Sequence, residues 1–168
     1  YYSIGTVYSD VAQAKSLSHE KSIKKQLYAF RKSVGIIEDE EYSKEEYGPY
    51  VNPFKCLLYT NYGNTLCSCG RNIEAIAQYK KAINIYPLFG MAIGNLGRVY
   101  QDYGVMDYDD VHQDYFHYFA YSLLKKAVEC KDPNTHKAAK DCFLRAMAGY
   151  TPQYVAGFLQ KDLEIPQF

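Results

Sequence analysis

The chain has 168 residues with 19 basic and 19 acidic side chains, so its formal net charge at pH 7 is zero. A neutral chain lacks the excess of positive charge that nonspecific nucleic-acid binding needs, although charge can still be locally segregated. No apolar run reaches the length of a membrane span, and five cysteines, an odd number without evident pairing, favour a reducing compartment. We therefore expect a cytoplasmic protein that binds neither membrane nor nucleic acid.

Residues 1–38 predict a pair of helices, the first beginning around Ile4 and the second centred on Phe30 and Ser33. An acidic stretch that contains a Gly-Pro pair follows at residues 39–55. This composition predicts a linker, which need not interrupt the packing of the helices on either side.

Residues 56–89 carry the most regular pattern in the chain. Aromatic, small and proline residues occur there at fixed offsets: Tyr59, Tyr62, Gly63, Leu66, Gly70, Ala75, Tyr79, Ala82 and Pro87. This spacing resembles the 34-residue tetratricopeptide repeat, in which small residues let two antiparallel helices approach and an aromatic ring fills the hole opposite. The resemblance implies a helical hairpin that must stack on neighbouring hairpins to bury its apolar face.

The same pattern recurs in residues 90–134. Residues of the expected types hold the first-helix and turn positions: Ile93, Leu96, Gly97, Tyr100 and Gly104. The second helix matches only if about eleven residues are inserted within the turn of the repeat. With this insertion, Ala120 and Ala127 stand at the two positions of the second helix that require a small residue, and Leu124 stands at the position for a large residue between them. The polar, Asp-rich residues 105–113 fill the gap and predict either an elongated loop or a helical extension.

Residues 135–168 give a weaker fourth repeat, because Tyr154 is too large for a small position although Phe158 and Pro166 match. The first repeat, like the third, fits only with an insertion, here of roughly nine residues. No strand-like alternation competes with these helical patterns. We therefore predict one domain with an all-α fold, a tetratricopeptide-like solenoid of about four helix-turn-helix repeats. The repeats cover residues 1–38, 56–89, 90–134 and 135–168, with residues 39–55 as the linker.

In tetratricopeptide proteins that grip extended peptides, the first helix of each repeat lines a concave groove. The resemblance implies groove positions in three repeats: Thr60, Asn61, Asn64 and Cys67; Met91, Asn95, Arg98 and Gln101; and His136, Lys140 and Phe143. Asparagine amides bridge the N–H and C=O groups of a peptide, and basic side chains pair with its acidic groups. We expect five of these residues to bind a peptide: Asn61, Asn64, Asn95, Arg98 and Lys140.

Chaperone-binding members of this class clamp a terminal carboxylate with two asparagines and several basic residues. Here Asn64 and Asn95 stand at the asparagine positions, and Lys140 stands where an arginine is usual. Thr60 and His136 replace two expected lysines, so the resemblance implies only part of such a clamp.

A second resemblance covers most of the chain, and its specific part is residues 59–97. The segments 59–64, 70–76 and 87–95 resemble a bacterial family that places such repeats ahead of a C-terminal HEPN-type domain. HEPN domains are often ribonucleases, marked by an arginine followed four to six residues later by a histidine. None of the arginines here has a histidine at that distance. The resemblance implies that any nuclease lies beyond residue 168, with this chain as its docking or sensing arm.

Sequence motifs for phosphate loops, dinucleotide binding, serine nucleophiles and zinc helices do not occur. Cys56, Cys67 and Cys69 with a histidine form a weak zinc candidate, because the Cys-x-Cys spacing points the thiols about 200° apart on a helix. Small cysteines in the core are the preferred interpretation. His112 and His117 lie near several aspartates, which favours a charged, solvent-facing start of a helix. We expect no catalytic residue, no metal and no cofactor.

The sequence thus predicts a non-catalytic scaffold that binds a protein or peptide, with an attached effector domain as a target of regulation. Two alternatives stay open. One is the docking or sensing arm of a HEPN-type nuclease. The other is homo-oligomerisation through the last helix, residues 153–163, whose apolar side chains have no following repeat to cover them.

Overall fold

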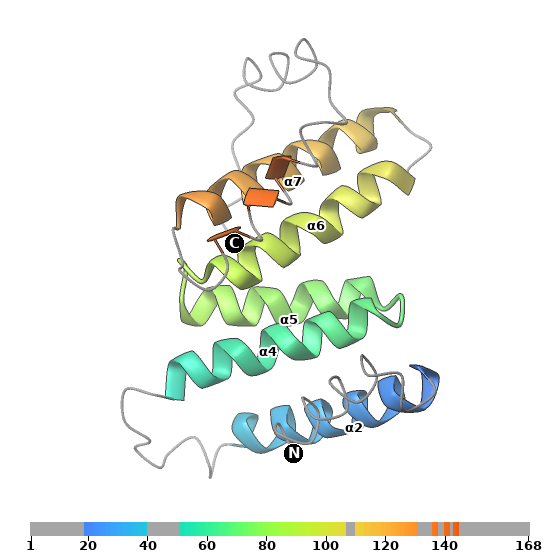
Figure 1. Cartoon of the computed structure of the whole chain (residues 1–168), viewed down its shortest axis with the longest axis vertical. Helices are drawn as coiled ribbons and strands as arrows, with labels where there is room; N and C mark the ends of the chain where they lie inside the picture. The colour runs from blue at the N-terminus through green and yellow to red at the C-terminus, as the bar shows by residue number, and fades with distance from the viewer. Residues whose placement is uncertain are drawn as a thin grey trace. The chain divides into compact units, whose positions relative to one another are not determined.

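The computed structural model describes residues 19–39, 51–106 and 110–130, together with residues 136, 137, 140, 141, 143 and 144. These residues are almost entirely helical and include no strand, which confirms the predicted all-α fold (Figure 1). The longer helices are α2 (His19–Glu38), α4 (Val51–Cys67), α5 (Asn72–Ile85), α6 (Gly90–Met106) and α7 (Asp110–Glu129). They belong to two compact units, Tyr1–Pro87 and Leu88–Phe168.

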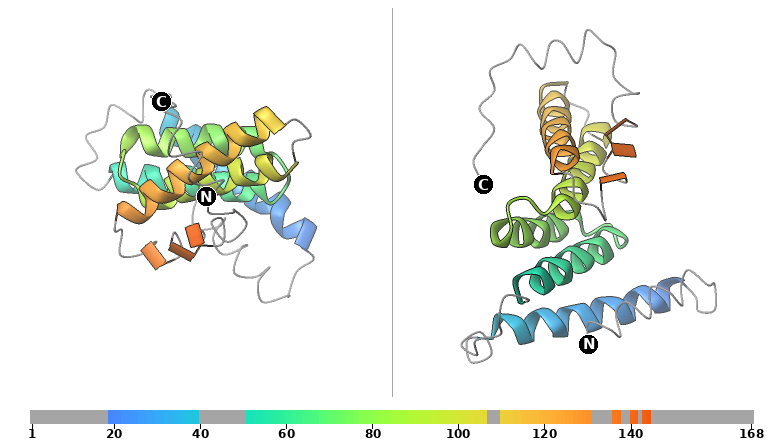
Figure 2. Two further views of the ribbon diagram at one scale, coloured as in Figure 1. Left: turned by 90° about the horizontal axis from the view of Figure 1, so that it is seen from above. Right: turned by 60° about the vertical axis from the view of Figure 1, so that its left-hand side comes forward.

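In the first unit, α4 and α5 lie side by side as a helical hairpin (Figures 1 and 2). Gly63 of α4 meets the ring of Tyr79 of α5, since a methyl group at Gly63 would lie 2.5 Å from Cε1 of that ring. Ala75, Tyr79 and Ala82 are fully buried. This small-against-aromatic contact is the packing that the repeat pattern predicts for residues 56–89.

Gly70 ends the first helix of this hairpin, as the pattern predicts. Its φ of +73° is left-handed, a conformation that glycine adopts without a steric penalty. The Gly70 N–H donates to the carbonyl of Cys67 at 2.9 Å, and the Arg71 N–H donates to that of Leu66 at 3.0 Å. These two hydrogen bonds form a Schellman motif, which satisfies carbonyl groups that a helix end otherwise leaves unpaired.

The helix α2 packs against α4 through a continuous buried stripe. Its residues recur every three or four positions: Ser22, Gln26, Ala29, Phe30, Ser33, Val34 and Ile37. The carboxylate of Glu38, at the end of α2, accepts hydrogen bonds from Tyr59 Oη at 2.9 Å and from Lys81 Nζ at 2.7 Å. Burial and this hydrogen bond raise the pKa of Tyr59. The end of α2 is therefore tied to both α4 and α5.

The helix α4 begins at Val51, inside the segment 39–55 that the sequence predicts as a linker. The linker prediction is wrong for residues 51–55. Pro53 is compatible with this position, because the N–H groups of the first helical turn have no partner within the helix.

In the second unit, α6 and α7 form another hairpin. A methyl group at Gly97 would lie 2.9 Å from Cγ of Leu124, and one at Gly94 would lie 3.6 Å from Cβ of Ala127. Ala120, Leu124 and Ala127 are fully buried. Gly97 and Leu124 thus repeat the contact of Gly63 and Tyr79, which confirms the predicted positions of the second helix after the insertion.

The inserted residues lengthen both helices of this hairpin. The helix α6 continues to Met106 and α7 starts at Asp110, so the helical-extension alternative is correct for residues 105, 106 and 110–113. The prediction that Gly104 is a turn residue is wrong. Gly104 lies buried inside α6, where a methyl group would approach the ring of His117 to 2.7 Å. The rings of Tyr103 and Phe116 pack across the lengthened part, with centroids 5.5 Å apart.

His117 is buried against Gly104, so we expect the free energy of unfolding to depend on pH. Burial lowers the pKa of His117 from its ordinary value of 6.5, and the nearby Asp114 carboxylate only partly opposes this shift. The unfolded chain therefore takes up a proton before the folded chain does as the pH falls. We expect the free energy of unfolding contributed by His117 to be fully present above pH 6.5 and to be lost as the pH falls through the lower pKa of the folded state.

Urea denaturation between about pH 7.5 and pH 5 measures this effect. His117→Gln should flatten the profile over that range, whereas His112→Gln, at an exposed position on the same helix, should leave it unchanged. Identical profiles for the two variants would exclude His117 as the source.

Candidate functional site

The helix α4 leaves one stripe of residues at least partly accessible beside its contacts with α2 and α5: Phe54, Leu57, Asn61, Asn64 and Ser68. Their spacing places them on one face of the helix. Two predicted site residues, Asn61 and Asn64, are neighbours there, about one turn apart. This side of α4 therefore presents two amides between apolar and hydroxyl side chains.

Asn64 also stabilises the hairpin itself. Tyr79 Oη donates a hydrogen bond of 2.8 Å to Oδ1 of Asn64. This bond joins α4 to α5 and fixes the orientation of the amide. Thr60, a predicted groove residue, is fully buried, and its hydroxyl donates to the carbonyl of Cys56 at 2.7 Å. The prediction that Thr60 lies in an accessible groove is wrong, because threonine can turn inward and satisfy its hydroxyl on its own helix.

The helix α6 has a corresponding accessible stripe: Met91, Asn95, Arg98, Asp102 and Val105. Asn95 is partly buried and Arg98 is exposed, and the two predicted site residues lie about one turn apart. Partial burial raises the pKa of Asp102, which the positive charge of Arg98 opposes. Val105, at the far end of the stripe, is 71% exposed. The stripe therefore combines an amide, a cation, a carboxylate and apolar side chains on one helix face.

The predicted groove residues beyond α7 have different surroundings. His136 Nδ1 lies 3.1 Å from the carbonyl oxygen of Val128, so it donates to one of the last carbonyl groups of α7. The ring of Phe143 packs near Tyr121 of α7, with centroids 5.6 Å apart. Of these three residues, Lys140 is exposed, whereas His136 and Phe143 are partly buried.

Four of the predicted site residues fall into two pairs, each within its own unit. Asn61 and Asn64 belong to the unit Tyr1–Pro87, whereas Asn95 and Arg98 belong to Leu88–Phe168. The first-repeat helix around Ile4 and the apolar helix at residues 153–163 lie outside the described residues, so both stay predictions.

The cysteines in the described helices make ordinary packing contacts. Cys56 is buried, with its Sγ 3.5 Å from the carbonyl oxygen of Ala82, and Cys67 Sγ lies 3.5 Å from Tyr79 Oη. Within the described residues, no cluster of three or more His, Cys, Asp or Glu side chains is arranged to hold a metal ion. None of the described helices has both the length and the apolar character to cross a membrane.

The two hairpins, with glycine against a large buried side chain in each, define an all-α protein built of helical hairpins. No family model matches the chain. Among curated proteins it is similar to the protein O-mannosyl-transferase TMTC1 of Homo sapiens and of Mus musculus, with 40% identity over 55 residues in each case. The matched segment covers 33% of this chain and 6% of each relative.

A match of 55 residues is longer than one 34-residue repeat and shorter than two. Since TMTC1 contains tetratricopeptide repeats, the similarity supports the repeat character of the chain. The activity in the name of TMTC1 belongs to a protein of which this chain spans only 6%. The resemblance to HEPN-linked proteins gains no support from these comparisons and stays a hypothesis.

Proposed function

We propose that the chain is a non-catalytic, tetratricopeptide-like module that binds a peptide or an extended protein segment. The main support is that α6 has its packing residues on one face and its polar residues on another. Gly94 and Gly97 face α7 and hold the hairpin together, while Asn95 and Arg98 lie on the accessible stripe. The polar groups of that stripe are therefore compatible with ligand contact without loss of the hairpin packing.

The chemistry of the stripe suits a peptide. The Asn95 amide offers a donor and an acceptor, which match the N–H and C=O groups of an extended backbone. The Arg98 guanidinium forms charge-assisted hydrogen bonds with a carboxylate, whether of a side chain or of a chain terminus. Met91 and Val105 add apolar contacts on either side. Asn61 on α4 offers the same amide chemistry in the first unit, and Lys140 adds a second cation in the second unit.

In this proposal the protein acts in the cytoplasm without a cofactor, and an effector domain joined to it responds to the bound peptide. The side chains on the accessible helix face determine which peptide binds, and the fold does not.

Screening the whole chain against an array of random 12-residue peptides, with free and with amidated C-termini, tests this function. We expect Arg98→Ala to weaken binding of the selected peptides about tenfold, the effect of losing one charge-assisted hydrogen bond. Asn95→Ala should weaken it by a similar factor.

Lys126→Ala is the matched control, because Lys126 is also an exposed cation of the second unit but lies on α7. It should leave binding unchanged, and circular dichroism should show equal helicity for all variants. The proposal fails if the array selects no peptide, or if Arg98→Ala and Lys126→Ala weaken binding equally.

A further inference from the structure

Three polar groups are linked at the accessible edge of the first hairpin. Tyr79 Oη lies 2.8 Å from Oδ1 of Asn64 and 3.5 Å from Sγ of Cys67. The side chain of Tyr79, on α5, is fully buried, whereas Asn64 and Cys67, both on α4, are partly accessible. The tyrosine hydroxyl group therefore reaches two partly accessible side chains from the interior of the hairpin.

The hydroxyl group of Tyr79 has one hydrogen, and it lies near two atoms that could accept it. An amide oxygen is a stronger acceptor than a sulfur atom, and Oδ1 of Asn64 is also the closer of the two. Tyr79 therefore donates to Asn64. The thiol of Cys67 is then the donor in its own contact with Tyr79, which keeps the hydroxyl hydrogen directed at Asn64.

This hydrogen bond determines which end of the Asn64 amide faces the interior of the hairpin. The oxygen and the nitrogen of an amide point in different directions from the same carbon atom. Since Oδ1 is held by a buried tyrosine, the NH₂ group of Asn64 lies on the side away from Tyr79. That group has two hydrogens, so it can donate to a ligand in addition to a contact within the protein.

We propose that Tyr79 is a positioning residue that makes Asn64 a hydrogen-bond donor to the backbone carbonyl groups of a bound peptide. This inference rests on the proposed function, and it selects one of the two roles that an asparagine amide can take. The bond from Tyr79 fixes the rotamer of Asn64 before the peptide arrives, which lowers the entropy cost of binding. The specificity of this position therefore depends on a buried residue that does not touch the peptide.

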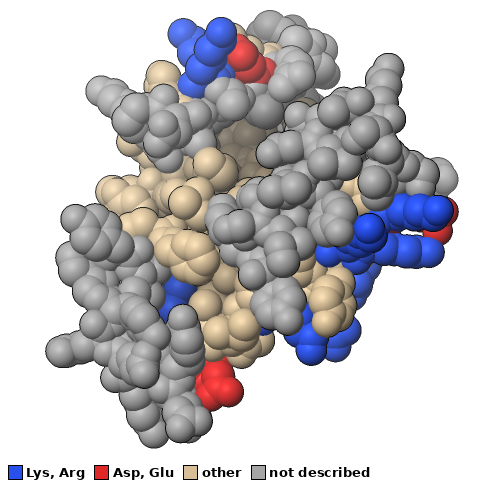
Figure 3. All heavy atoms as spheres, turned by 60° about the horizontal axis from the view of Figure 1, so that its bottom comes forward, with Lys and Arg blue, Asp and Glu red and all other residues tan. Residues whose placement is uncertain are grey.

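The probe for this inference must report hydrogen bonding to Asn64 and not general charge. Figure 3 shows Lys and Arg side chains gathered in one area of the surface, where an acidic peptide would bind through charge alone. The probe is therefore the tightest-binding peptide of the array that has an amidated C-terminus and no Asp or Glu. Isothermal titration calorimetry with the whole chain measures its dissociation constant.

Asn64→Ala should weaken binding of this probe about tenfold, the effect of losing one well-placed hydrogen bond. Tyr79→Phe removes only the hydroxyl group and should weaken binding about threefold, because the amide must then be ordered by the peptide. In the Asn64→Ala background, Tyr79→Phe should have no further effect, because no amide is left to position. Asn64→Asp keeps an oxygen for Tyr79 but has no N–H donor, so it should bind as weakly as Asn64→Ala.

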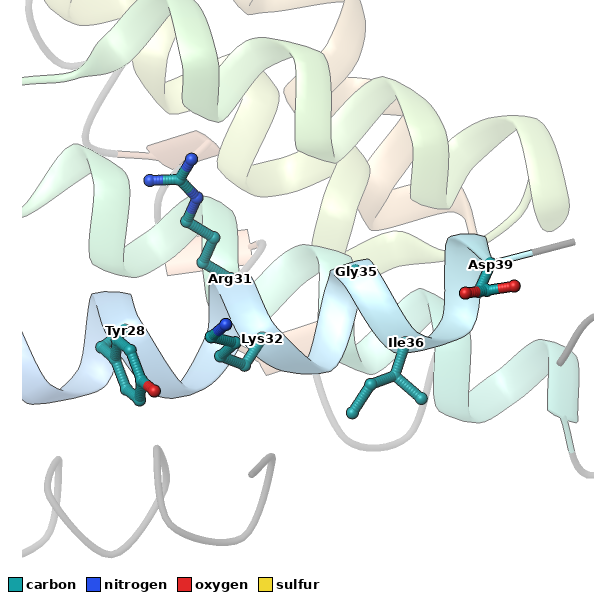
Figure 4. Close-up of a pocket in the computed structure, with 6 residues that line it drawn as sticks. All are labelled: Tyr28, Arg31, Lys32, Gly35, Ile36 and Asp39. Atoms are coloured by element: carbon teal, nitrogen blue, oxygen red, sulfur yellow. The ribbon is translucent and has the colours of Figure 1, made fainter. Parts of the chain in front are cut away.

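Two controls separate positioning from stability and from other surfaces of the same unit. Tyr59 Oη donates to Glu38 at 2.9 Å, so Tyr59→Phe also removes a hydrogen bond made by a buried tyrosine. It should lower stability in urea, as Tyr79→Phe does, and leave the affinity for the probe unchanged. Lys32→Ala changes an exposed side chain of α2 beside Tyr28 (Figure 4) and should also leave the affinity unchanged.

The inference is overturned if Asn64→Ala does not weaken binding, if Tyr79→Phe acts equally with and without the Asn64 amide, or if Tyr59→Phe has the same effect. It is also overturned if the array selects only charged peptides, or if Asn64→Asp binds as tightly as the unchanged protein. In each of these cases, array peptides whose binding depends on Arg98 would leave the proposed function intact. An array that selects no peptide contradicts both.

Discussion

Replacing Gly63 with alanine is expected to destabilise the first unit by about 1–3 kcal/mol. The new methyl group would lie 2.5 Å from Cε1 and 2.9 Å from Cδ1 and Cζ of Tyr79, whose ring is fully buried. Either the ring or the backbone of α4 must move, and the better helix propensity of alanine offsets only about 1 kcal/mol of that cost. Urea denaturation followed by circular dichroism measures the change.

Gly35→Ala provides the matched control in the same unit, since a methyl group there meets nothing within 4 Å. We expect this variant to stabilise the protein by about 0.5–1 kcal/mol, the usual gain from replacing an unconstrained glycine inside a helix. Shifts of the same sign for the two variants would show that Gly63 does not pack against Tyr79.

The second large effect is expected for Leu124→Ala, at about 2–5 kcal/mol. Leu124 is fully buried and contacts Gly97, so its truncation leaves a cavity between α6 and α7. The result also tests the position of the insertion. Without the inserted residues, the large position of the repeat would fall on Gln113 instead of Leu124.

Gln113→Ala is therefore the comparison, and it should change the free energy of unfolding by no more than about 0.5 kcal/mol. Both residues belong to α7, so a general effect on that helix would appear in both variants. A larger loss of stability for Gln113→Ala than for Leu124→Ala would mean that α7 packs against α6 as in a repeat without the insertion.

The hairpin packing was predictable because its contacts depend on residue size at fixed spacings. Gly63 and Tyr79 lie within one repeat, and the small residues around Leu124 identify the corresponding helix even after an insertion. Gly104 was assigned wrongly because a turn and a close helix contact both require a residue without Cβ. Only its partner His117, which is in another helix, distinguishes the two roles.

The candidate sites were less predictable, because accessibility depends on neighbouring helices. Asn95 and Arg98 are accessible as expected, but Thr60 is buried although it was assigned to the same kind of position. The hydrogen bond of Asn64 with Tyr79 joins two helices, and spacing along one helix does not reveal it. The exposed face of α2 also has a signal in the sequence, a second periodicity that combines aromatic, aliphatic and charged residues.

The central claim is that each unit contains a hairpin in which a glycine of the first helix packs against a large side chain of the second. Nuclear Overhauser effects measure these contacts directly in solution. We expect cross-peaks between Gly63 Hα and the ring protons of Tyr79, and between Gly97 Hα and the methyl groups of Leu124. Absence of both sets of cross-peaks from a helical, fully assigned protein would contradict the account.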